Sequence, residues 1–303
     1  MFKSADPYFE NLLRSVWNNA LPFPTLTGEK VQTGKDVRFA KSSLEFRSLR
    51  KVSACRNLIR GADHSWITTD VRLHDWHGLR RLSTTYVRGE DPRLFIFQKN
   101  PHVMVQVFKE EKKDIEIIIR NIDSGYEFRL ESPFGFNGKN WVPFEINSEL
   151  YFLYSLSPLI VLQLKDYGKS NQLEKLNDVK NFNPKWEHDL VESIGIYRGG
   201  SPALKINSNN IFGFSHAINP DADIHAHRLG IFSLSMLDFR LEHDYLTNYE
   251  PDFLIDPYGL QIRNGKVLLD GTMAVGDIHI PESLIYNFRM RFELDSLKQF
   301  FKE

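Results

Sequence analysis

The sequence predicts an all-β protein, a five-bladed β-propeller with short helical extensions at its N- and C-termini. From about residue 94 onward, the chain is a succession of short β-type runs bounded by turn residues, and long helical patterns are missing. At four places, spaced by roughly 50 to 60 residues, a proline precedes a strand, a polar turn and a second strand. That interval suits a blade of four strands, and 303 residues leave room for five blades.

The predicted strands are short apolar runs separated by polar residues and turn formers. They include Leu94–Phe97, His102–Phe108, Ile115–Ile122, Tyr126–Leu130, Leu150–Leu156, Ile160–Leu164 and Ile211–His216. Asn264 and Gly265, between the runs 260–263 and 266–269, predict a tight hairpin, because a type I′ turn needs positive φ at both central residues. Helical patterns are confined to Tyr8–Asn18 and Ser296–Phe301.

The repeat is marked by Pro92, Pro143, Pro202 and Pro257. Prolines at strand entrances are common in any β protein, so their spacing alone leaves a different β fold open. The segment 166–186 is polar and rich in lysine and asparagine, which predicts a surface insertion between blades.

Composition and charge narrow the class of protein. We expect one domain over residues 1–303, with 1–40 as an N-terminal extension packing on the propeller. The formal net charge of −1 argues against nucleic acid or an anionic membrane as the main partner. Cys55 is the only cysteine, so no intramolecular disulfide is expected, and the first 17 residues carry too many charges for a signal peptide or a transmembrane segment. These features favour a cytoplasmic protein.

The segment Gly89-Glu90-Asp91-Pro92-Arg93, just before a strand of Leu-Phe-Ile-Phe, is the densest chemical signal. In isolation, two carboxylates beside an arginine favour a salt bridge at a turn. Here the glycine allows close backbone approach and the proline fixes the corner, so Asp91 is predicted to stand rigidly at the top of a buried strand. A carboxyl group held in this way suits general acid/base catalysis.

This segment resembles a motif of the glycoside hydrolase family 130 phosphorylases and the related β-mannosyltransferases, and the similarity continues in order over roughly residues 86–290. The further phrases are 139–144 (KNWVPF) with 150–155 (LYFLYS), 198–204 (RGGSPAL) with 212–216 (FGFSH), His227-Arg228, and 274–277 (AVGD). The resemblance implies a five-bladed propeller that carries a carbohydrate-processing site on its axis.

The resemblance also implies the roles of individual residues. Asp91 is the expected catalytic acid/base, and the expected sugar-binding residues are Glu90, Arg93, Lys139, Asn140, Arg198 and Asp277. Phosphate, or the phosphate of an activated donor, is expected to bind Arg198, His216, His227 and Arg228, in keeping with the bidentate fit of guanidinium groups to phosphate. The implied partners are a carbohydrate acceptor and a nucleotide-sugar or sugar-phosphate donor, and no cofactor or metal is expected.

Some positions depart from the family pattern. Ala274 stands where the family has a turn glycine, and His225 precedes the His-Arg pair where the family often has an aromatic residue. No clear sugar-binding motif stands between Lys41 and Asp75, where Arg56, Asn57 and Arg60 are the candidates. A metal-site interpretation of Asp221, Asp223, His225 and His227 is the minor alternative, because residues i and i+2 of a strand point the same way.

The sequence therefore predicts a glycosyltransferase that forms a β-linked, mannosyl-type glycan by inverting single displacement. Two alternatives stay open: a β-mannoside phosphorylase or hydrolase, and a non-catalytic sugar-binding propeller.

Overall fold

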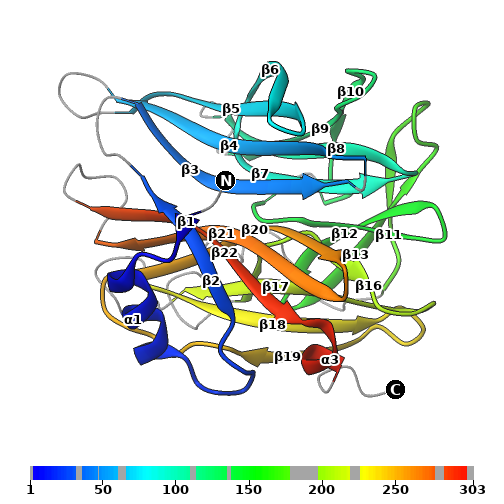
Figure 1. The fold of residues 1–303 in the computed structure, drawn as a ribbon. Coiled ribbons are helices and arrows are strands. Elements are labelled where there is room, and N and C mark those ends of the chain that lie inside the picture. The colour runs from blue at the N-terminus through cyan, green and yellow to red at the C-terminus, as the bar shows by residue number, and fades with distance from the viewer. Residues whose placement is uncertain are drawn as a thin grey trace.

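The protein is a five-bladed β-propeller, as predicted (Figure 1). The computed structural model describes residues 3–31, 36–46, 48–60, 66–109, 114–134, 138–177, 197–218, 226–276 and 283–298. Five antiparallel sheets are arranged around a central axis. In this part of the chain, no helix is long and apolar enough to cross a membrane.

The first three blades follow one another along the chain, each with four strands ordered from the axis outwards. They comprise β3 (Asp36–Glu45), β4 (Arg50–Arg60), β5 (Trp66–His77) and β6 (Arg80–Arg88); β7 (Glu90–Phe97), β8 (Asn100–Lys109), β9 (Asp114–Asn121) and β10 (Glu127–Leu130); and β11 (Val142–Ile146), β12 (Glu149–Leu156), β13 (Leu159–Lys165) and β14 (Gln172–Lys175).

The fourth blade has a divided inner strand, and the fifth is completed by the N-terminus. They comprise β15 (Tyr197–Gly199), β16 (Leu204–Lys205), β17 (Asn210–Ile218), β18 (His227–Ser235) and β19 (Arg240–Tyr245); and β20 (Phe253–Arg263), β21 (Lys266–Val275), β22 (Leu284–Glu293), β2 (Thr25–Lys30) and β1 (Lys3–Ser4). Because β2 pairs with β22, the two ends of the chain close the ring (Figure 1).

The marker prolines lie where the repeat requires them. Pro92, Pro143 and Pro257 are in the inner strands β7, β11 and β20, and Pro202 lies just before β16. An inner strand pairs on one side only, so a residue without an N–H group costs it no ladder hydrogen bond on the open side. The predicted Asn264-Gly265 hairpin is confirmed, with φ of 51° and 71° between the paired residues Arg263 and Lys266.

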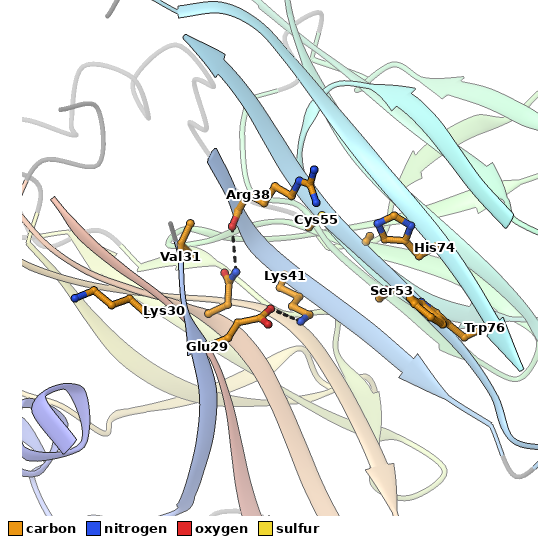
Figure 2. A pocket seen from close by; sticks show the side chains of 11 residues that line it. Glu29, Lys30, Val31, Arg38, Lys41, Ser53, Cys55, His74 and Trp76 are labelled. Carbon is orange, nitrogen blue, oxygen red and sulfur yellow. Dashed lines mark hydrogen bonds and ion pairs between the residues drawn. The ribbon is translucent and has the colours of Figure 1, made fainter. Parts of the chain in front are cut away.

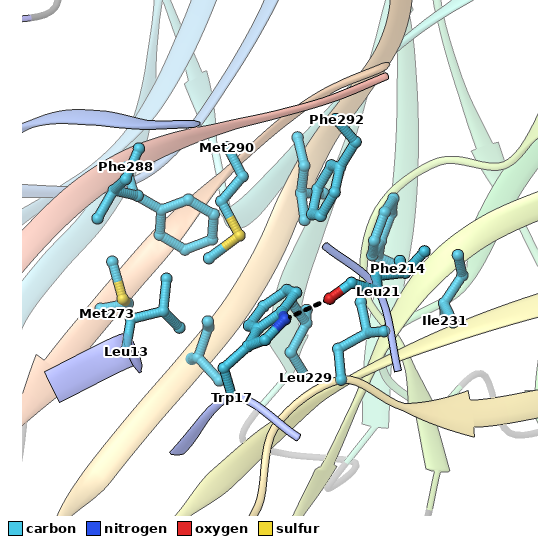
Figure 3. Close-up of a cluster of buried hydrophobic side chains, with 14 of the residues drawn as sticks. Leu13, Trp17, Leu21, Phe214, Leu229, Ile231, Met273, Phe288, Met290 and Phe292 are labelled. Atoms are coloured by element: carbon cyan, nitrogen blue, oxygen red, sulfur yellow. Dashed lines mark hydrogen bonds between the residues drawn. The ribbon is translucent and has the colours of Figure 1, made fainter. Parts of the chain in front are cut away.

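The N-terminal helix covers the outer part of blades 4 and 5. Helix α1 (Pro7–Val16) begins with Asp6 as its N-cap, whose carboxylate accepts a hydrogen bond from the Tyr8 N–H at 2.9 Å. Phe9, Leu13 and Val16 recur at helical spacing and are buried. They join a cluster that includes Trp17 and the aromatic and methionine side chains of β22 (Figure 3). The short C-terminal helix α3 (Leu294–Leu297) begins two residues before the predicted one, whose last residues lie outside the described part.

Two sequence-based boundaries differ from the structure. Residues 1–40 are not one extension, because β2 belongs to blade 5 and β3 begins blade 1. The segment 166–186 is not wholly an insertion, since residues 172–175 form β14, the outer strand of blade 3, and 178–186 lie outside the described residues. An outermost strand keeps one edge and much of its surface in water, so its sequence is polar and resembles a loop.

A polar network locks blade 5 to blade 1. The buried Arg289 guanidinium of β22 lies 2.6 Å from Asp270 of β21 and 2.5 Å from Glu45 of β3, and the Ser43 hydroxyl donates to Asp270 at 2.6 Å. Burial would raise the pKa of Glu45, but Arg289, Lys51 and Arg263 outweigh it and hold that pKa below its usual value. Ring closure therefore relies on charge pairing as well as on strand β2.

Candidate functional site

The carboxyl-bearing segment Glu90–Asp91 opens β7 at one end of the propeller axis. At the opposite ends of the inner strands, side chains from all five blades line a cavity of about 330 Å³. A β-bulge lies between Glu90 and Arg93, and Asp91 has φ of 49°, in the left-handed region. Bulges and left-handed residues re-aim side chains and recur at functional sites. The bulge turns Asp91 out of the regular ladder of β7.

Basic side chains hold this segment from two neighbouring blades. Arg56, from β4 of blade 1, places its Nη2 2.6 Å from Glu90 Oε2 and its Nη1 3.4 Å from Asp91 Oδ1. Lys139, which precedes β11, approaches Glu90 Oε1 at 3.3 Å. Glu90 is thus an anchor between blades 1 and 3, and Asp91 keeps the longer, weaker contact. Of these two carboxyl groups, that of Asp91 is therefore the one more available to react with a ligand.

The environment of Asp91 favours its protonated form. Burial raises the pKa of its carboxyl group, the neighbouring Glu90 carboxylate adds to the rise, and Arg56, Arg93 and Lys139 oppose it. The side chain retains 15% exposure, so a ligand can reach it. A reachable acid with a raised pKa is what proton donation requires.

Arg93 lies beneath Asp91 and links three blades. Its side chain is 1% exposed and donates to Gly200 O at 2.5 Å, to Asn140 Oδ1 at 3.0 Å and to the Asp91 carbonyl at 3.2 Å. The Asn140 N–H in turn donates to Gln106 Oε1 at 3.2 Å. Burial lowers the pKa of this guanidinium, although the acidic groups around it act in the opposite direction. Because its side chain is 1% exposed and donates to the Asp91 carbonyl, Arg93 is suited to position Asp91 from beneath.

The Gly199-Gly200 pair lets the inner strand of blade 4 approach its neighbours. A Cβ on Gly199 would lie 2.2 Å from the Asn140 carbonyl oxygen, and a Cβ on Gly200 would lie 2.4 Å from Pro257 Cγ. No side chain fits at these distances. The glycines in the phrase 198–204 are therefore required by packing at the axis, beside the Arg93 contacts.

A second polar group gathers in blades 4 and 5. His227 of β18 places Nδ1 2.6 Å from Asp256 Oδ1 of β20, His216 Nδ1 of β17 lies 3.8 Å from the same oxygen, and the two imidazole rings stack at 5.0 Å. Burial lowers the pKa of His216 to about 3, with His227 and Arg198 acting in the same direction. His216 is therefore neutral at physiological pH. Burial alone would raise the pKa of Asp256, but the two histidines hold it well below its usual value.

Tyr258 connects the two groups. Its hydroxyl donates to Asp256 Oδ2 at 3.4 Å, and burial together with the charges of Asp91 and Asp256 raises its pKa well above 10. The phenol is thus a proton-bearing hydrogen-bond donor near both carboxylates. Sequence analysis missed Asp256 and Tyr258. The signal was the repeat itself, because Asp256-Pro257 in blade 5 matches Asp91-Pro92 in blade 2.

The remaining predicted residues lie in different parts of the structure. Arg198 pairs with His216 in the sheet and lies beside this cluster. Arg228 lies apart from it, since neighbouring strand residues point to opposite faces, and its guanidinium lies over the rings of Tyr245 and Tyr249. The predicted Asp277, together with residues 221–225 of the metal-site interpretation, lies outside the described residues. Of the blade 1 candidates, Arg56 reaches Asp91, whereas Asn57 lies on the opposite face of β4 and Arg60 is the last residue of that strand.

The atoms of His216, His227 and Asp256 that could ligate a cation lie within 4.8 Å of one another. Two imidazoles and a carboxylate are ligands that divalent transition metals accept. In the structure, Asp256 Oδ1 instead accepts the hydrogen bond from His227, which fixes that ring and leaves its Nε2 on the far side. The cluster is thus arranged as a hydrogen-bonded pair with a neutral histidine stacked on it.

We use the term axial site for Glu90, Asp91, Arg56, Arg93, Lys139, Asn140, Arg198, His216, His227, Asp256 and Tyr258. Its residues lie in or next to strands of all five blades, and they combine one protonatable carboxyl group with imidazole, phenol, guanidinium, ammonium and amide donors. Such a set can donate a proton to one atom of a polar ligand while binding an oxyanion nearby.

Comparison with known structures supports the architecture. MPT-4, a mannose phosphorylase from Leishmania mexicana solved with a phosphate ion, matches with a TM-score of 0.57 and 14% identity over 90% of each chain. A hypothetical protein from Leishmania major matches with a TM-score of 0.54 and 13% identity, covering 94% of this chain and 93% of its own. No family model matches the sequence, and no curated protein matches it significantly. At these identities the likeness establishes a shared fold.

Proposed function

We propose that this protein is a carbohydrate-processing enzyme that exchanges a glycosidic bond with phosphate, or with a phosphate-activated donor, using Asp91 as acid/base. The observation that carries the proposal is the position of Asp91. Its carboxyl group is reachable and has a raised pKa, it lies beside the ion pair of Arg56 and Glu90, and the buried imidazole cluster is close to it. The fold shared with a structure described as a mannose phosphorylase with bound phosphate supports the same reaction class.

In the phosphorolytic direction, the Asp91 carboxyl donates its proton toward the glycosidic oxygen as the bond to the anomeric carbon breaks. A phosphate oxygen attacks that carbon from the opposite face, so the products are a sugar 1-phosphate of inverted configuration and a free hydroxyl. In this proposal Arg198 and His216 bind the phosphate, and the Tyr258 oxygen, whose proton is donated to Asp256, accepts a hydrogen bond from a sugar hydroxyl. Synthesis is the same step reversed, with Asp91 as base.

Phosphate as nucleophile accounts for the single reactive carboxyl group. An ordinary inverting hydrolase needs a second carboxylate, some 6.5–9.5 Å away, to activate water. Within the described residues, the other carboxylate of the axial site next to the imidazoles is Asp256, and its oxygen already accepts a 2.6 Å hydrogen bond from His227. Asp256 is better suited to fix His227 than to act as that base.

Glycosyl transfer from a nucleotide sugar or a sugar 1-phosphate, the interpretation favoured by the sequence, is the second candidate. It rests on the phrases His227-Arg228 and 139–144. Trp141 of the second phrase is fully buried in the core between blades 2 and 3, and Arg228 stacks on tyrosines away from Asp256. Because packing explains the presence of Trp141 and Arg228, these residues do not favour glycosyl transfer. We therefore prefer phosphorolysis.

The test is a donor and acceptor screen with a matched pair of variants. The purified protein is incubated with mannose 1-phosphate or GDP-mannose and a panel of sugars, and products and released phosphate are measured. Asp91→Asn is expected to lower kcat by about 10²- to 10⁴-fold while ligand affinity stays within a few-fold. Asp295→Asn, on the exposed α3, is the control and is expected to match wild type. Unchanged turnover in Asp91→Asn would remove the proposed role, and binding without turnover in wild type would favour the sugar-binding alternative.

A further inference from the structure

A pocket of about 490 Å³ lies between blades 1 and 5, away from the axial site. We call it the side pocket; it is lined by side chains of β2, β3, β4, β5 and β22, among them Lys41, Cys55 and Trp76 (Figure 2). Cys55 and Arg56 are successive residues of β4, so their side chains point to opposite faces of the blade. The side pocket therefore lies behind the strand that sends Arg56 to Asp91.

The lining of the side pocket carries a surplus of positive charge. Arg38 and Lys41 line the pocket together with one carboxylate, Glu29, whose Oε1 lies 2.5 Å from Lys41 Nζ, and the ammonium of Lys30 points away from that carboxylate (Figure 2). Two lining groups respond to this field. Burial lowers the pKa of His74, and Arg81, Arg38, Arg72 and Lys41 lower it further. Burial raises the pKa of the Cys55 thiol, and Lys41, Arg38 and Arg72 oppose the rise. The field therefore favours an anion.

The rest of the lining suits a polar ring rather than a bare ion. Trp76 offers an indole face beside His74, with the ring centroids 6.4 Å apart. Ser53 and Asn287 are buried polar residues of the lining. Hydroxyl groups of a ligand can pair with such groups, and an aromatic face packs against an apolar ring surface.

We propose that the side pocket binds an anionic saccharide, a hexose whose phosphate or carboxylate meets Arg38 and Lys41 and whose ring packs on Trp76. A guanidinium fork and an ammonium next to an indole recognise both halves of such a ligand. The volume is within the range of small-molecule sites. This site is separate from Asp91 and does not depend on the reaction proposed there.

Cys55 supplies a direct readout, because it lines the pocket and is the only cysteine of the chain. The rate of its alkylation by N-ethylmaleimide is measured in wild type without ligand and with mannose 6-phosphate, glucuronate, neutral mannose or inorganic phosphate. Mannose 6-phosphate or glucuronate is expected to slow alkylation at least about tenfold at saturation, and the protection is expected to weaken with added salt. Mannose and inorganic phosphate are expected to give little protection. Whichever acid protects better identifies the anionic group.

Variants locate the binding. Lys41→Met and Trp76→Leu are expected to abolish protection, whereas Lys266→Met, which removes a comparable surface pair with Glu293, is expected to leave it intact. Asp91→Asn is expected to retain protection of Cys55. A failure of the side-pocket proposal can therefore be told apart from a failure of the reaction proposed at the axial site. Equal alkylation rates with all four probes would overturn the proposal. So would equal protection by neutral mannose or by inorganic phosphate alone.

Discussion

Replacing Arg93 by methionine is expected to destabilise the propeller and impair the axial site together. The guanidinium makes three hydrogen bonds, to Gly200 O, Asn140 Oδ1 and Asp91 O, and is almost completely buried. Each acceptor left without a partner costs roughly 1–3 kcal/mol. Three such acceptors together cost about 3–9 kcal/mol, and relief from burying the cation returns part of this, so a loss of about 3–5 kcal/mol remains. We expect a loss in that range.

The assay is thermal unfolding of wild type, Arg93→Met and Arg240→Met. At about 2–4 °C per kcal/mol for domains of 150–250 residues, the Arg93 variant is expected to lose roughly 6–20 °C in Tm. Arg240, on the outer strand β19, has a side chain that is 61% exposed, and its replacement is expected to change stability by less than about 0.5 kcal/mol. kcat is expected to fall only in the Arg93 variant, because Asp91 loses the contact to its carbonyl. An Arg93→Met protein with wild-type Tm and turnover would refute the assignment of this residue as the link between blades.

Three further outcomes follow from buried groups. The pKa of His216 is about 3 in the folded protein against a usual 6.5, so between these pH values the unfolded chain binds the extra proton, and stability falls as the pH drops from 6.5 toward 3. In urea titrations, His216→Gln is expected to flatten this dependence of stability on pH. His77→Gln, at an exposed position, is expected to leave it unchanged. Gly199→Ala places a Cβ 2.2 Å from a backbone oxygen and is expected to cost about 1–3 kcal/mol, read from the urea midpoint, which an unshifted midpoint would contradict. Arg289→Met leaves the buried Asp270 uncompensated and is expected to cost about 3–5 kcal/mol, measured in the same way, with a change below 1 kcal/mol arguing against the closure network.

The repeat could be predicted from the sequence because it depends on the properties of individual residues, above all proline. Inner strands of a propeller are the edges of their sheets, so they accept proline, and the four prolines marked four of the five blades. The type I′ turn at 264–265 and the capped helix α1 were likewise predictable from short-range preferences. What these features share is that their cause lies within a few residues of the chain.

Ring closure and part of the axial site depended on contacts between distant segments. The pairing of β2 with β22 joins residues more than 250 positions apart, and nothing in the composition of 25–30 announces that partner. Asp256 and Tyr258 carried a signal, an Asp-Pro step like that of blade 2, but their closeness to His227 and Asp91 appears only once the blades meet. The prediction that Arg228 binds phosphate together with His227 conflicts with strand geometry, because adjacent residues of a strand point to opposite faces.

The contacts that hold the blades together at this end of the axis are those that shape the axial site. Arg56 and Glu90 join blades 1 and 2, Arg93 joins blade 2 to blades 3 and 4, and His227 with Asp256 joins blades 4 and 5. Because each contact serves both purposes, most substitutions here change stability and activity together, and lost turnover alone cannot identify a catalytic group. Asp91 is the exception, since among the described residues its side chain makes the 3.4 Å contact with Arg56 and no other hydrogen bond or ion pair, and an asparagine has nearly the same shape. A loss of turnover in Asp91→Asn at unchanged Tm therefore separates proton transfer from assembly of the ring.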